Sequence, residues 1–209
     1  TSDATKRAVV GEISSLINDF INLGSRTLSG LDFGLQYRTP ETRFGRFMIR
    51  AEATRNLQRD EDLSDEGVID DQLGKDGYAK WVGNARIGWS KGGLSADWLT
   101  TYYGSFADTS AATTAEIYEA LDRPNYIKHM NVNGVDRYYY RVKAAVQHSL
   151  RVGYEFGGKN GGHNRHSLNL TIHNLFDVAP PIADETNGYF VGTANPRGRQ
   201  FRIKYEHRF

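Results

Sequence analysis

The last twelve residues of the chain, GRQFRIKYEHRF, constrain the fold more than any other stretch. Apolar or aromatic side chains occupy alternate positions at Phe201, Ile203 and Tyr205, and polar side chains occupy the positions between them. This alternation indicates a β-strand with one apolar and one polar face. The apolar face of such a strand packs on a core in a water-soluble sheet and meets lipid in a transmembrane barrel. Both interpretations are open on this stretch alone.

Alternation recurs along the chain and predicts about eight strands. The longest segment, 138–156, predicts one strand of roughly 60 Å at about 3.3 Å per residue, far longer than a globular strand. Only a tall barrel or a long β-ribbon uses such a strand. The alternating segments are 31–37, 46–54, 81–89, 94–106, 138–156, 168–176 and 200–209, and residues 11–22 form a further β-capable segment.

The links between these segments alternate in length. The links at Pro40, 91–93 and 157–165 are short, and the intervening stretches 58–78, 107–136 and 177–199 are long and without period. Short turns at one end and long loops at the other are typical of an outer-membrane barrel. Residues 58–78 are rich in Asp and Glu but lack the ligand spacing of an EF-hand, so a solvated acidic loop is favoured over a calcium site.

Composition excludes several classes of protein. No run of the 209 residues approaches 18 consecutive apolar positions, which excludes a membrane-spanning helix. The absence of cysteine excludes disulfides and thiolate metal sites, and a net charge of +1 gives no indication of a nucleic-acid partner. His163 and His166 lack a third patterned ligand. No nucleophile elbow or metal signature is present, so we expect no enzyme activity, no metal and no cofactor.

The C-terminal residues resemble a known family. HSLNLTIHNLFDVAPP (166–181), GYF (188–190) and NPRGRQFRIKYEHRF (195–209) are similar in order and spacing to the end of a TonB-dependent outer-membrane receptor. In that family an NLFD sequence near a Pro pair closes the penultimate strand, an NPRGR-like stretch opens the last strand, and the chain stops at Phe. SRTLSGLDFGLQYRTPETRFGRF (25–47) resembles the strand, periplasmic turn and strand unit of the same family more loosely.

The resemblance implies an all-β fold, an antiparallel transmembrane β-barrel with long extracellular loops and short periplasmic turns. Residues 1–209 would then supply about the last eight of 22 strands. No signal peptide, TonB box or plug domain is visible, so we expect the plug and the N-terminal strands to lie outside this chain. The implied function is TonB-dependent import of a scarce nutrient, a ferric siderophore, cobalamin or a saccharide, across the bacterial outer membrane. The implied partners are TonB acting through the absent plug, the barrel-assembly machinery, outer-membrane lipid with lipopolysaccharide, and the nutrient.

Two groups of site residues follow. The barrel-assembly signal is assigned to Phe201, Ile203, Tyr205 and Phe209, which plain lipid-facing packing would also explain. Ligand contacts are expected from aromatic residues of the external loops, which stack on sugars and siderophore rings, and from two lumen cations that attract anions. Local packing and an internal ion-pair network are the alternatives for these two sets. The candidates are Tyr118, Tyr126, Tyr189 and Phe190 on the loops and Arg141 and Lys143 in the lumen.

Two other functions remain open. A complete eight-stranded barrel with a filled interior would act structurally or as an adhesin, with charges such as Arg50 and Glu52 paired inside it. A soluble β-rich binding module or glycan-active enzyme is the third possibility, in which the apolar faces cover a core.

Overall fold

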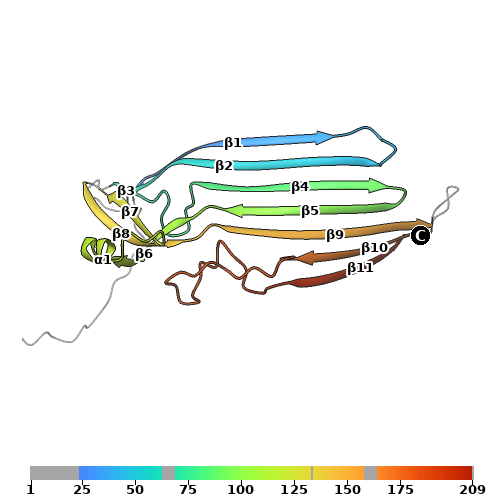
Figure 1. The fold of residues 1–209 in the computed structure, drawn as a ribbon. Helices are drawn as coiled ribbons and strands as arrows, with labels where there is room; N and C mark the ends of the chain where they lie inside the picture. Colours follow the sequence, from blue (N-terminus) through green and yellow to red (C-terminus); the bar gives the residue numbers. More distant parts are fainter. Residues whose placement is uncertain (1–23, 63–68, 133, 158–163, 209) are drawn as a thin grey trace, which may run out of the picture.

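The computed structural model describes residues 24–62, 69–132, 134–157 and 164–208. The segment predicted at 11–22 and the terminal Phe209 lie outside the described residues. One large antiparallel sheet dominates the structure, with the strand order β1-β2-β4-β5-β9-β10-β11 (Figure 1). Its strands are β1 (Arg26–Arg38), β2 (Arg46–Asp62), β4 (Trp81–Lys91), β5 (Leu94–Tyr103), β9 (Ala145–Gly157), β10 (Arg165–His173) and β11 (Gln200–Arg208).

This sheet confirms the prediction of an all-β, antiparallel fold. Within the described residues it does not close on itself, because β1 and β11 are its two edges and do not pair with each other. The described part of the chain contains no helix long and apolar enough to cross a membrane.

A second, smaller sheet lies at one end of the large sheet (Figure 1). It has the order β6-β8-β7, from β6 (Phe106–Thr113), β8 (Val135–Val142) and β7 (Ile127–Val132). The short helix α1 (Ala115–Ala120) connects β6 to β7 and begins at Thr114, whose hydroxyl accepts the N–H of Ile117. We call residues 72–80, 104–144 and 174–199, which gather at this end, the cap.

Residues 107–136, predicted to form one long loop, contain regular secondary structure. These residues form most of β6, α1, β7 and the start of β8. The predicted strand 94–106 also ends early, at Tyr103, because Gly104 turns the chain and donates its N–H to the carbonyl of Trp81. Strands have a side-chain period of two residues and a helix has a period of about 3.6. Short strands joined by a helix therefore show no single period in the sequence.

The prediction of one 19-residue strand at 138–156 is wrong. The segment contains two strands, β8 and β9, which belong to different sheets and are separated by Lys143 and Ala144. Val142, Ala144 and Val146 keep an apolar residue at every second position through this break. A period of two shows which face of the sheet each side chain lies on, but it does not show which strand pairs with which. It therefore cannot reveal that the pairing changes.

The acidic stretch 58–78 is only partly a loop. β2 continues through it to Asp62, and β3 (Ile69–Asp71) pairs with the end of β2. Two carboxylate pairs face each other across these strands, Asp60 opposite Asp71 and Glu61 opposite Asp70. Glu61 also forms an ion pair with Arg26, with 2.9 Å between Oε1 and Nε, and this pair offsets part of the repulsion between the carboxylates.

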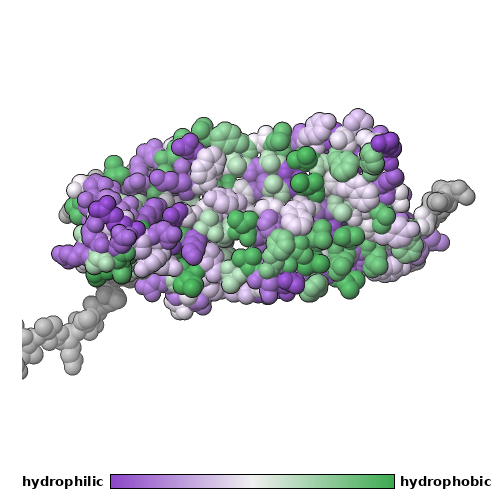
Figure 2. Space-filling model, in the orientation of Figure 1, coloured by the Kyte–Doolittle hydropathy of each residue, from purple (hydrophilic) through white to green (hydrophobic). Residues whose placement is uncertain are grey.

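The large sheet has one apolar and one polar face. Directly opposed residues share a face, so the strand register gives rows that cross all seven strands. Figure 2 shows the hydrophobic side chains gathered over the strands and the hydrophilic ones gathered at the cap end. One apolar row is Tyr37, Ile49, Ile87, Trp98, Leu150, Ile172 and Phe201, and a row of the opposite face is Arg38, Met48, Gly88, Asp97, Arg151, Thr171 and Arg202.

The apolar face is open. Leu35 is 60% exposed and Ile203 is 74% exposed, although each lies within a regular strand. Exposed apolar area on this scale marks an interaction surface in a folded protein.

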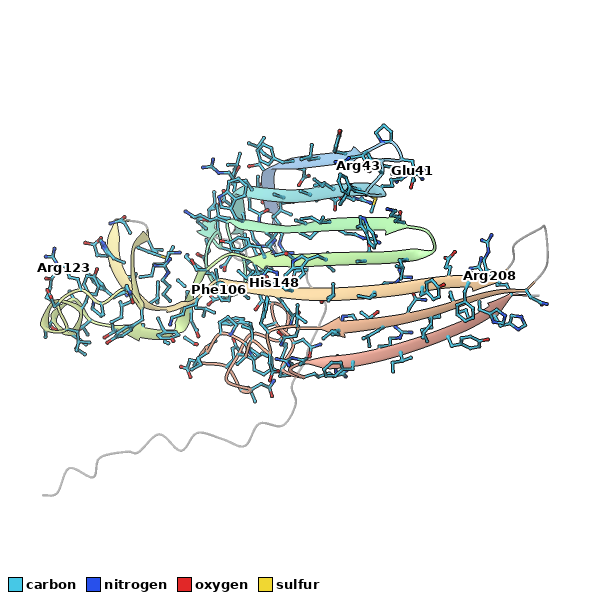
Figure 3. The ribbon with its side chains drawn as sticks, turned by 45° about the vertical axis from the view of Figure 1, so that its right-hand side comes forward. Glu41, Arg43, Phe106, Arg123, His148 and Arg208 are labelled. Atoms are coloured by element: carbon cyan, nitrogen blue, oxygen red, sulfur yellow. The ribbon has the colours of Figure 1, made fainter. Side chains whose placement is uncertain are left out.

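The links between strands of the large sheet are short at one end and long at the cap end. At the short end, Gly92 and Gly93 have φ of 56° and 85°, the positive values of a two-residue hairpin turn. A side chain on Gly93 would also lie 2.5 Å from the carbonyl oxygen of Glu155 on the neighbouring strand. Figure 3 labels Glu41, Arg43 and Arg208 at this end and Arg123 at the far end of the cap.

Candidate functional site

The polar face of the large sheet is held together by charged side chains. Both Nε and Nη2 of Arg86 donate to Asp97 Oδ1, at 3.0 and 2.8 Å, from neighbouring strands. Nε and Nη2 of Arg151 likewise both donate to Oδ1 of Asn169 on β10, at 3.1 and 2.7 Å. Such a face requires water or polar partners, because isolated charges are costly to bury in an apolar medium.

The charge on this face is uneven. Near β4 and β5 the cations have acidic partners, as Arg86 has, but the last three strands carry more cations than carboxylates. Glu206 on β11 is engaged by Lys204 at 2.7 Å. Two shallow pockets of about 160 and 300 Å³ lie over this basic region. Its cations are Arg151, Arg165, Arg202, Lys204 and Arg208.

The cap has a conventional buried core where it meets the large sheet. Phe106, labelled in Figure 3, is 1% exposed. It packs edge-on against Phe190, with ring centroids 4.8 Å apart. Val142 and Ala183 belong to the same buried cluster, and Tyr103 from β5 packs against it. The cap is thus anchored to the sheet by buried apolar contacts.

Buried carboxylate contacts fix the cap loops to one another. Asp108 is fully buried and accepts the Ser110 hydroxyl at 2.5 Å and the Asp184 N–H at 2.6 Å. Asp76 accepts the N–H and hydroxyl of Thr109, at 2.8 and 2.6 Å. These bonds join the segments 72–80, 104–144 and 174–199 and hold them in one arrangement.

A polar pocket of about 360 Å³ lies where the cap meets β1 and β2. Asp32 and Thr54 come from the polar face of these strands, and Tyr78 comes from the cap. We call this the polar pocket. Its lining is Leu28, Ser29, Gly30, Asp32, Thr54, Asn56, Gln58, Arg59, Leu73, Tyr78, Ala79 and Tyr103.

A β-bulge shapes the polar pocket. Asn56 pairs with Gly30 and Gln58 pairs with Ser29, so Leu57 is the extra residue on β2. Bulges redirect neighbouring side chains and are frequent beside functional sites. Here Asn56, Gln58 and Arg59 all line the same pocket.

Hydrogen bonds hold the polar pocket in one arrangement. The Thr54 hydroxyl donates to Asp32 at 2.6 Å, and the Asn56 amide donates to the carbonyl of Ala79 at 2.8 Å. The Tyr103 hydroxyl donates to the carbonyl of Gly77. The guanidinium carbon of Arg59 lies 3.6 Å from the ring centroid of Tyr78, a close cation–π contact.

The cap beside the pocket contains a half-buried lysine. Lys128 Nζ donates to the carbonyl of Gly74 at 3.2 Å. Burial lowers the pKa of Lys128, and the charges of Lys80 and Arg141 lower it further.

The two motifs that carry the family resemblance meet in space. Asp177 of the NLFD stretch accepts the backbone N–H of Arg199, from the NPRGR stretch, at 2.7 Å. Asn174 is 1% exposed, accepts the N–H of Val178 at 2.9 Å and donates to its carbonyl at 2.9 Å. These residues therefore close the long link between β10 and β11.

The structure does not gather the predicted loop aromatics into one site. Tyr118 lies on α1 and its ring contacts that of Tyr138 in a tilted arrangement, with ring centroids 4.9 Å apart. Tyr126 is 43% exposed just before β7. Tyr189 is half-buried in the link before β11, and Phe190 packs against Phe106 of the cap core. None of the four lines the polar pocket.

The two predicted cations do not lie on one long strand of the large sheet. Arg141 lies on β8 of the small sheet, with Nη2 3.4 Å from the Ser105 hydroxyl, and Lys143 is exposed in the break before β9. Neither lies on the polar face of the large sheet. Their role in ligand binding stays a prediction.

The residues assigned to the assembly signal share the apolar face of β11. Phe201, Ile203 and Tyr205 are 65%, 74% and 58% exposed, and the Tyr205 hydroxyl lies 2.7 Å from His166 Nδ1. Phe209 lies outside the described residues.

Metal ligands are not concentrated in the described part of the chain, where no group of three or more His, Cys, Asp or Glu side chains is placed to hold a metal ion. His166 instead stacks on His207, with ring centroids 4.4 Å apart.

Sequence reasoning missed the polar pocket. Its residues Gln58, Arg59 and Tyr78 fall in the stretch interpreted as a solvated acidic loop. One signal was present, because polar residues continue at every second position after Arg50, at Glu52, Thr54, Asn56 and Gln58. That pattern extends β2, but no sequence signal places Tyr78 beside it.

No family model, no curated protein and no solved structure matches the chain.

Proposed function

We propose that this chain is the C-terminal part of the barrel of a TonB-dependent outer-membrane receptor, supplying barrel wall and external loops for nutrient import. The observation that carries the proposal is the apolar row from Tyr37 to Phe201, which crosses seven antiparallel strands. Within the described residues, Tyr37, Ile87 and Phe201 of this row are 57%, 52% and 65% exposed. Lipid is the partner that such a face fits when the opposite face is polar.

Three further features support the proposal. The edges of the described sheet, β1 and β11, are unpaired, and unpaired edges are tolerated in a membrane only when further strands pair with them. The cap lies at the end with long links, as external loops do. The contact of Asp177 with Arg199 gives a structural reason for the motifs that resemble the family.

In this proposal the sheet corresponds to about the last third of a 22-stranded barrel, and its polar face lines the lumen. The polar pocket then opens toward the lumen beneath the external loops and captures the nutrient. TonB acts on a plug domain carried by another part of the protein.

The test is the intact mass and N-terminal sequence of the protein extracted in detergent from the outer membrane of its source. We expect a mass several-fold above 23.5 kDa, with plug sequence upstream of Thr1. A band of 23.5 kDa starting at Thr1 would contradict the proposal and favour a complete eight-stranded barrel with a structural or adhesive role. Uptake that survives loss of TonB would contradict the import mechanism.

A further inference from the structure

We infer that the polar pocket binds a neutral, polyhydroxylated ligand, namely one end of a saccharide, rather than an anionic ferric chelate. The inference rests on the proposed import function and narrows its substrate class.

The pocket offers free hydrogen-bond acceptors. The side-chain donor groups beside them already bond to other protein atoms. The Thr54 hydroxyl occupies Oδ1 of Asp32, which leaves Oδ2. The Asn56 amide N–H₂ donates to Ala79, and the Gln58 amide N–H₂ donates to Asp60 at 2.6 Å. Each amide then keeps its carbonyl oxygen as an acceptor for a ligand. A matching ligand must bring several donors close together, as adjacent sugar hydroxyls do.

The pocket also contains an unsatisfied donor. Arg59 Nε is buried and has no hydrogen-bond partner within the part of the chain that the structure describes. An unsatisfied buried donor in a native structure points to a missing water or ligand. A hydroxyl group donates and accepts at once, so a sugar serves both Arg59 and the acceptor oxygens.

The charges around the pocket disfavour an anion. Within the lining, the carboxylate of Asp32 balances the guanidinium of Arg59. Arg59 is already paired with Glu61, at 3.4 Å between Nη2 and Oε1. The lining therefore offers an anionic chelate no unpaired cation, and the carboxylate of Asp32 repels it, whereas a neutral ligand meets no such repulsion.

The size and the aromatic lining agree with this ligand class. A volume of about 360 Å³ lies near the lower end of the roughly 300–1,000 Å³ usual for small-molecule sites. Tyr78 is 37% exposed while Arg59 lies over its ring, so its position is set before a ligand arrives. A rigid aromatic beside convergent polar groups suits the mixed apolar and hydroxylated faces of a sugar ring.

The experiment measures equilibrium binding to the full-length protein purified in detergent. The probes are short neutral oligosaccharides of hexoses and of pentoses, and an anionic ferric catecholate chelate. We expect saturable binding of a neutral oligosaccharide and none of the chelate. Gln58→Ala and Tyr78→Ala are each expected to raise the Kd about five- to tenfold, the loss of one hydrogen bond or one aromatic contact.

Gln36→Ala is the matched control, because Gln36 is an exposed carboxamide on the polar face of β1 outside the pocket. It is expected to leave the Kd unchanged. Chelate binding that is weakened by Gln58→Ala would overturn the saccharide inference and leave the import function standing. Saccharide binding that neither pocket variant weakens, or no saccharide binding at all, would also overturn it. Failure of the import function itself would appear separately, in the mass measurement and in the dependence of uptake on TonB.

Discussion

The cap buries apolar side chains in a core, whereas the strands of the large sheet leave many of theirs exposed. In the cap, Phe106, Val142 and Ala183 are nearly inaccessible, and the carboxylate of Asp108 is buried with its hydrogen bonds satisfied. In the sheet, Leu35 and Ile203 are 60% and 74% exposed within regular strands, whereas the most exposed apolar residues of the cap, Ile182 and Val191, lie in its irregular link.

The difference shows that the two regions are built for different surroundings. A water-exposed region stabilises itself by removing apolar area from water. The sheet has no such core within the described residues, and in the proposed barrel its apolar face meets lipid. On that proposal, one chain contains a part that water stabilises and a part that lipid stabilises.

The largest expected effect is in the cap core. Phe106→Ala leaves a cavity beneath Phe190 and is expected to cost about 3–5 kcal/mol of cap stability. Hydrogen exchange should show faster exchange for amides of β6 and β8, with β10 and β11 unchanged. Phe44→Ala, which truncates a ring that is 60% exposed, is the control and should change neither region. Equal effects from the two variants would remove the distinction between cap and sheet.

A smaller effect is expected on the apolar face of the sheet. Ile203→Arg places a charge in lipid and is expected to lower the free energy of unfolding in bilayers by about 2–4 kcal/mol. Denaturant unfolding of the full-length protein in vesicles measures this change. Lys204→Arg on the opposite face of β11 is the control, with no loss expected. If Ile203→Arg is tolerated as well as Lys204→Arg, the apolar face does not meet lipid.

The smallest effect concerns pH and the β7–β8 hairpin. Hydrogen bonds from Asn131 and His129 hold the pKa of Asp136 below its ordinary value of 3.8. The folded hairpin therefore binds fewer protons than the unfolded one, and this stabilisation is complete above pH 3.8 and disappears as the pH falls through the folded pKa. Amide exchange in the hairpin should accelerate modestly over that range. Asp136→Asn should abolish the pH dependence, and a dependence that persists in it would assign the effect to another group.

The sequence predicts the sheet well and the cap poorly, for a physical reason. In residues 31–37 and 200–205, apolar and polar side chains alternate because each face of the strand keeps the same surroundings along its length. This regularity is visible in the sequence. The cap forms a small core from distant residues, among them Phe106, Val142 and Phe190, and no local period records such contacts. The break between β8 and β9 escapes detection because alternation continues across a change of partner strands.

The candidate site was less predictable than the fold. Aromatic residues in long links suggested ligand contacts, but Phe190 packs in the cap core. The polar pocket depends on the bulge at Leu57 and on the chain reversal that brings Tyr78 beside Arg59. Both features come from tertiary pairing, which a single sequence does not display.

The most direct test of the account is the exposure of alternate β11 residues to lipid. Because this chain has no cysteine, single substitutions from Phe201→Cys to Glu206→Cys can each carry one fluorescent label in the full-length protein in bilayers. Lipids with brominated acyl chains should quench labels at positions 201, 203 and 205 and spare those at 202, 204 and 206. Equal quenching at all six positions, or quenching of the second set alone, would contradict the assignment of the apolar face to lipid.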